Sequence, residues 1–109
     1  MTTQSAWLLL LVAGLLEVGW AVGLKFTDGF TRPGASAATL VAMVLSVILL
    51  AQAVRTLPVG TAYAVWTGIG AAGTALVGIA VLGESREALR LVCIALIVAG
   101  TVGLKFVTR

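Results

Sequence analysis

The side chain best placed for chemistry is a carboxylate in the middle of an apolar run. Residues 6–24 read AWLLLLVAGLLEVGWAVGL, and Glu17 is the only charged side chain among them. A helix of this length crosses a hydrocarbon core about 30 Å thick, with Glu17 near its middle. An acid at that depth costs roughly 2.5 kcal/mol or more, so intramembrane acids are usually functional. The sequence therefore indicates a site at Glu17 for a cation or a proton.

The residues expected around Glu17 combine space with hydrogen-bond donors. Gly14, three residues before Glu17, shares its helical face and leaves room beside it. A buried carboxylate needs donors, because an unpaired polar group in an apolar medium is costly. Four side chains in the apolar runs can supply them: Trp20, Ser46, Tyr63 and Trp66. The alternative is that the aromatic rings only pack and that Ser46 bonds a carbonyl of its own helix.

No basic side chain stands in the middle of an apolar run, where it could pair with Glu17. A carboxylate without such a counter-ion binds either a cation from outside or a proton. Both partners are therefore candidates for the same site.

The composition is that of an integral membrane protein. Of 109 residues, 61% are hydrophobic and 10% are charged, and the mean hydropathy is +1.16. Soluble domains carry about 25% charged residues. With no His and four acidic residues, we expect neither a metal or other cofactor nor an enzyme. The net charge of +3 does not indicate nucleic-acid binding, because the basic residues stand at the ends of apolar runs, where they anchor a protein in the lipid bilayer.

The apolar runs predict an all-α membrane protein with four transmembrane helices. We expect these helices at about residues 6–25, 35–54, 58–82 and 88–106. The connecting segments are short and rich in turn formers, so residues 1–109 are expected to form a single four-helix transmembrane domain. Pro58 suits the first position of the third helix, and Ser85 suits the N-cap of the fourth.

Glycines within the runs predict close helix packing, because small residues let backbones approach each other in lipid. Gly19 and Gly23 form a GxxxG pair on the side of the first helix away from Glu17. In the fourth helix the small positions include Cys93 and Gly100. One chain of this size has little interior for both a charged site and a pathway, so we expect an oligomer.

The third run contains GIGAAG at residues 68–73, which matches the dinucleotide-binding fingerprint letter by letter. That fingerprint requires a strand before it and a helix opening at it. Here the letters lie inside a spanning helix. We interpret them as a packing surface, with a kink at Gly68 and Gly70.

These motifs together resemble the small multidrug resistance transporters, and the resemblance covers essentially the whole chain. The matching segments are Gly14-x-x-Glu17-x-x-Trp20, Phe26-x-x-Gly-Phe-Thr-Arg32, Ser46 with Gln52, and Leu57-Pro-x-Gly-x-Ala-Tyr-Ala-x-Trp-Thr-Gly-Ile-Gly70. Within this family, Trp20 and Gly14 resemble the guanidinium exporter subtype, whereas the promiscuous drug exporters usually carry Gly at the position of Trp20.

The resemblance implies a proton-coupled antiporter that works as an antiparallel homodimer with dual topology in the bacterial cytoplasmic membrane. Glu17 of both subunits would bind either protons or the substrate cation. The implied site lining is Gly14, Trp20, Ser46, Tyr63 and Trp66. The fourth helix, with Cys93 and Gly100, would hold the two subunits together.

The chemistry of guanidinium fits this expectation. The ion is planar and permanently charged, and its N–H donors form a fork that suits a carboxylate. Three alternatives remain at this point. One is a broad exporter of quaternary ammonium and other drug cations, another is a non-transporting membrane subunit in which Glu17 only bonds a neighbouring helix, and a third is a passive channel.

Overall fold

The computed structural model describes residues 2–108 and consists of four helices joined by short turns. The helices are α1 (Thr3–Phe26), α2 (Pro33–Ala53), α3 (Val59–Val81) and α4 (Ala88–Val107). All four are long and apolar enough to cross a membrane. The prediction of four spanning helices is therefore confirmed. Each helix begins and ends within three residues of its expected bounds, and positions 1 and 109 of the expected domain lie outside the described residues.

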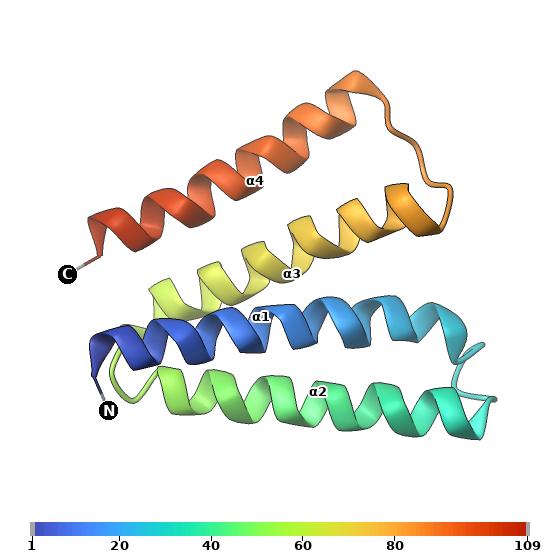
Figure 1. Cartoon of the computed structure of the whole chain (residues 1–109), viewed down its shortest axis with the longest axis horizontal. Coiled ribbons are helices and arrows are strands. Elements are labelled where there is room, and N and C mark those ends of the chain that lie inside the picture. Colours follow the sequence, from blue (N-terminus) through green and yellow to red (C-terminus); the bar gives the residue numbers. More distant parts are fainter. Residues whose placement is uncertain (1, 109) are drawn as a thin grey trace.

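The helices run up and down, and α1 lies between α2 and α3 (Figure 1). Helix α1 packs against both α2 and α3. Of the described helices, only α3 comes into backbone contact with α4. The result is a slab of 41 × 35 × 16 Å. The start of α1, the end of α4 and the α2–α3 turn lie at one edge of the slab (Figure 1). This arrangement puts the centre of α1 between two neighbours and leaves α4 at the margin.

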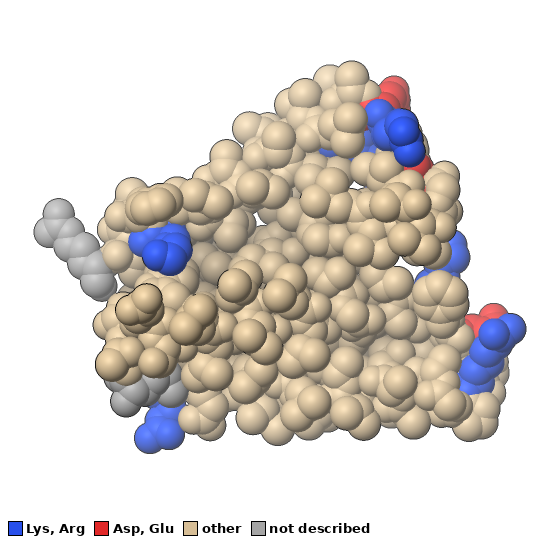
Figure 2. Space-filling model, in the orientation of Figure 1, with Lys and Arg blue, Asp and Glu red and all other residues tan. Residues whose placement is uncertain are grey.

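The buried core lies between α1, α2 and α3. Its members are small or apolar: Ala6, Leu10, Ala13, Ala53, Leu57, Ala62, Val65 and Trp66. The outward faces are equally apolar, with most Leu, Val and Ile side chains of α2 and α4 exposed. Charged side chains gather at the two edges of the slab and leave the band between them uncharged on the face shown (Figure 2). This is the surface of a protein surrounded by lipid.

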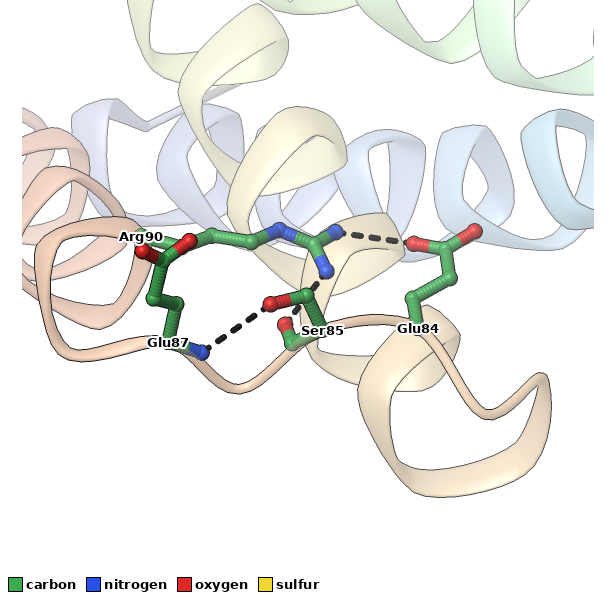
Figure 3. Close-up of polar contacts among 4 residues, drawn as sticks. All are labelled: Glu84, Ser85, Glu87 and Arg90. Atoms are coloured by element: carbon green, nitrogen blue, oxygen red, sulfur yellow. Dashed lines mark hydrogen bonds and ion pairs between the residues drawn. The ribbon is translucent and has the colours of Figure 1, made fainter.

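The predicted cap of the fourth helix is wrong. Glu87, not Ser85, is the N-cap residue, and the Ser85 hydroxyl accepts the backbone N–H of Glu87 at 3.2 Å within the preceding loop (Figure 3). The loop is held by Arg90, which donates to the Ser85 carbonyl at 2.6 Å and pairs with Glu84 at 2.8 Å. These bonds hold Ser85 in the loop, and the helix begins at Ala88, the residue at which the sequence predicted it. Pro58 likewise caps α3 and does not occupy its first turn.

The predicted GxxxG packing surface of the first helix is correct at only one of its two glycines. A Cβ at Gly23 would lie 2.5 Å from the Thr39 hydroxyl oxygen, so α2 approaches closely there. Gly19 has no atom within 4 Å of the corresponding position and faces open space. A side chain could therefore be added at Gly19 without a clash, but not at Gly23.

Candidate functional site

Glu17 projects from the middle of α1 onto a glycine of α3. A Cβ added to Gly70 would overlap the Oε1 and carboxyl carbon atoms of Glu17, so only glycine admits the carboxylate here. One turn further along, a Cβ at Gly73 would come within 2.5 Å of the Val18 side chain. Helices α1 and α3 thus run parallel and pack together through side chains of α1 that lie against glycines of α3. Gly70, expected as a kink in a packing surface, lies within a continuous helix, and the Glu17 carboxylate packs against it.

Gly14 makes the opposite contact. A Cβ at Gly14 would lie 2.6 Å from Cγ2 of Ile69, so here a side chain of α3 fills the space left by a glycine of α1. Gly14 is buried. The sequence suggested open room at this position, but Ile69 occupies it, because the absence of a side chain on one helix draws the neighbouring helix closer.

Ser46 and Trp66 form a buried hydrogen-bonded pair that is anchored to α1. The Ser46 hydroxyl donates to the Ala13 carbonyl at 2.7 Å and accepts the indole N–H of Trp66 at 3.0 Å. Ser46 is fully buried and Trp66 is 9% exposed. In an α-helix the carbonyl of residue 13 also accepts the backbone N–H of residue 17. The pair therefore fixes the turn of α1 that carries Glu17, and sequence reasoning did not anticipate the Ala13 carbonyl as its anchor.

Two polar atoms of α1 are buried without a hydrogen-bond partner among the described residues: Oε1 of Glu17 and the indole nitrogen of Trp20. They belong to residues one turn apart on the same face of the helix. Buried polar atoms are normally paired, and an unpaired one costs about 1–3 kcal/mol. None of the four predicted donors bonds to Glu17 within the chain. In a single chain, the site therefore contains one unpaired hydrogen-bond acceptor, on Glu17, and one unpaired donor, on Trp20.

Tyr63 lies at the margin of the site. Its ring centre is 5.7 Å from that of Trp66, with the planes tilted by 49°. It is 58% exposed, in contrast to the buried Trp66. The structure thus brings Glu17, Trp20, Ser46 and Trp66 together around the middle of α1, with Tyr63 at the edge. Cys93 and Gly100 are exposed on α4, and no group of three metal-binding side chains occurs in residues 2–108.

Comparison with known proteins decides the family. The sequence model described as Small Multidrug Resistance protein matches residues 5–97. The chain belongs to the small multidrug resistance family. It is 60% identical over 104 residues to a protein named "Guanidinium exporter" from Citrobacter freundii, which covers 95% of this chain and 99% of the relative. A "Guanidinium exporter" of Escherichia coli (strain K12) is 59% identical with the same coverage.

Membership of the small multidrug resistance family fits the four apolar helices. The chain is a multi-pass protein of the bacterial inner membrane. Its relatives are named as exporters and not as enzymes. The resemblance seen in the sequence motifs is thereby confirmed for the family and for the subtype that these relatives represent.

Proposed function

We propose that this protein exports guanidinium and small substituted guanidinium ions in exchange for protons, with Glu17 as the shared binding group. The observation that supports this most directly is the buried, unpaired Glu17 carboxylate oxygen in the middle of a spanning helix. The carboxylate forms no ion pair with a side chain of residues 2–108, where the one such pair joins Arg90 and Glu84. The names of the relatives supply the substrate class.

Guanidinium offers what this site lacks. Its N–H donors can satisfy carboxylate oxygens in pairs, and its positive charge offsets the desolvation of the acid. Ser46 and Trp66 are already bonded to each other, which leaves Glu17 free to bind the substrate. The unpaired indole N–H of Trp20 lies one turn away and can orient a carboxylate or a bound water.

The site needs a second copy of the chain to be complete. Glu17 is only half-buried in one chain, and α4 presents nearly all of its apolar length outward, including Cys93 and Gly100. We propose an antiparallel homodimer in which α4 forms part of the contact and two Glu17 side chains face one cation. Each subunit then serves as the inverted repeat of the other, which is the symmetry that alternating access requires.

Exchange follows from competition for the same carboxylates. Two acids without a cation in a low-dielectric site take up protons, and a cation can bind only when protons leave. An opening that alternates between the two membrane faces then converts an inward proton gradient into outward transport of guanidinium.

The decisive experiment uses purified protein in liposomes. With an imposed pH gradient, guanidinium should move against its own gradient, and collapsing the pH gradient should stop this movement. Flux that persists without the opposing proton gradient would instead show a passive channel. Absence of any flux with correctly inserted protein would support a non-transporting subunit.

We expect Trp20 to narrow the range of substrates. Its indole occupies the face of α1 next to Glu17, so a tetrasubstituted ammonium would have to displace it, and overpacking costs about 1–3 kcal/mol. Such cations should bind about 5- to 150-fold more weakly than guanidinium. Trp20→Gly should reduce this difference in a competition assay, with some loss of guanidinium binding. If the wild-type protein transports tetraphenylphosphonium as well as guanidinium, the protein is a broad drug exporter of the same family.

We also expect single chains to insert in both orientations. Two basic residues, Arg55 and Lys105, belong to the edge with the α2–α3 turn, and Arg109, which lies outside the described residues, is counted with them from the sequence. The other edge carries four basic residues: Lys25, Arg32, Arg86 and Arg90. Three against four is almost no bias under the positive-inside rule. Reporter fusions at the C-terminus should therefore give signal on both sides of the membrane. Signal from one side alone would exclude an antiparallel dimer.

A further inference from the structure

A groove lies between α1, α3 and α4, at the edge of the slab where α1 begins and α4 ends. Its volume is about 740 Å³, within the range of about 300–1,000 Å³ typical of ligand pockets. The groove exists because α4 packs on α3 and stands away from α1 (Figure 1). Glu17 is not among its lining residues, so the groove is separate from the site described above.

The inner part of the groove is apolar. Leu8 and Leu11 of α1 form one wall, Ile69 of α3 forms the floor, and Val102 of α4 closes the other side. All of these residues belong to helices that cross the membrane, and both leucines are well exposed. The apolar molecule that a bilayer always supplies at this depth is an acyl chain.

The mouth of the groove is cationic. The Lys105 ammonium lies 5.4 Å from the centre of the Trp7 ring, a cation–π contact at the level of the headgroups. Polar side chains accompany it at the mouth, namely Thr3, Gln4 and Thr108. Lys105 has no carboxylate partner among residues 2–108. A phosphate group matches this set, because it accepts hydrogen bonds from ammonium, hydroxyl and amide groups and neutralises the charge.

We propose that this groove binds one anionic phospholipid per chain, with its phosphate at Lys105 and one acyl chain along Leu8, Leu11 and Val102. The lipid would fill the space between α1 and α4, two helices whose backbones do not come into contact. A second copy of the chain is the competing occupant. An antiparallel neighbour would bring its α3–α4 loop to the same membrane surface, but there the two acids Glu84 and Glu87 are balanced by Arg86 and Arg90, and Glu84 is already paired with Arg90.

Native mass spectrometry of the purified full-length chain tests the proposal without any transport measurement. In detergent with equal amounts of phosphatidylglycerol and phosphatidylcholine, the wild-type protein should retain one phosphatidylglycerol per chain. Lys105→Gln should weaken this retention about fivefold, the effect of one basic residue near a membrane surface. The matched control is Arg55→Gln, because Arg55 lies at the same edge, bonds Gln52 at 3.3 Å and does not line the groove. This control should retain lipid as the wild type does.

Equal retention of the two lipids by the wild type would overturn the proposal, and so would equal losses in Lys105→Gln and Arg55→Gln. The wild-type comparison stands even if Lys105→Gln does not fold. A photoreactive benzoylphenylalanine in place of Leu8 separates the two occupants in liposomes that contain phosphatidylglycerol. A chain–lipid adduct supports a lipid in the groove, whereas a chain–chain adduct assigns the groove to a second copy.

Discussion

Glu17→Gln is expected to abolish the coupled exchange of guanidinium for protons while leaving the protein folded. The amide is nearly the same size as the carboxyl group, so it can occupy the same position against Gly70. It cannot bind and release a proton, and it cannot balance the charge of a cation in a low-dielectric site. In liposomes with an opposing proton gradient, guanidinium flux should fall to that of protein-free vesicles.

The matched control is Glu87→Gln, which removes the same charge at an exposed position outside the four helices. It should transport as the wild type does. Helical content measured by circular dichroism should be equal for wild type and both variants. Movement of guanidinium against its gradient by Glu17→Gln would show that another group carries the coupling, and the proposed function would then be wrong in its central residue.

The sequence was sufficient to predict the four helices because the length and the boundaries of the apolar runs determine them. Each apolar run is as long as the membrane is thick and ends at turn formers and charges, so few other structures satisfy the backbone in lipid. The position of Glu17 near the middle of α1 follows from the same count. The features that remained hidden concern which helix packs against which.

Helix pairing was hidden because the surfaces that face lipid are as apolar as those that face protein. In a soluble bundle, an alternation of polar and apolar residues would mark the buried face of each helix. Here the buried Leu10 and the exposed Leu8 are the same residue type. The position of α1 between α2 and α3, and of α4 beside α3 alone, therefore could not be predicted from the pattern.

The partners of the site residues were hidden for a related reason. Ser46 and Trp66 were expected as donors to Glu17, but Trp66 donates to Ser46, and Ser46 donates to the Ala13 carbonyl. Backbone carbonyls inside helices carry no signal in the sequence. Gly70 likewise has no side chain from which a partner can be inferred, and the role of its empty position depends on a residue from another helix. The one available signal was the spacing of Gly70 and Gly73, which places both on one face.

Gly70→Ala is expected to weaken guanidinium binding about 5- to 150-fold, because its Cβ would overlap the Glu17 carboxyl group and overpacking costs about 1–3 kcal/mol. Alanine stabilises a helix interior by roughly 0.5–1 kcal/mol relative to glycine, so a loss of affinity in this variant cannot be explained by a weaker helix. The variant should therefore keep its helical content and lose affinity.

Gly19→Ala is the matched control for this substitution. It adds the same methyl group to α1 two residues from Glu17, at a position with no atom within 4 Å. Guanidinium binding, measured by isothermal titration calorimetry on protein in detergent, should be unchanged in Gly19→Ala and reduced in Gly70→Ala. Equal affinities in the two variants would mean that the carboxylate moves away from α3 when it binds its cation. A loss of affinity in Gly70→Ala alone would instead mean that the Glu17 carboxylate still contacts Gly70 when it binds the cation. The contact between α1 and α3 would then determine the position of the charge.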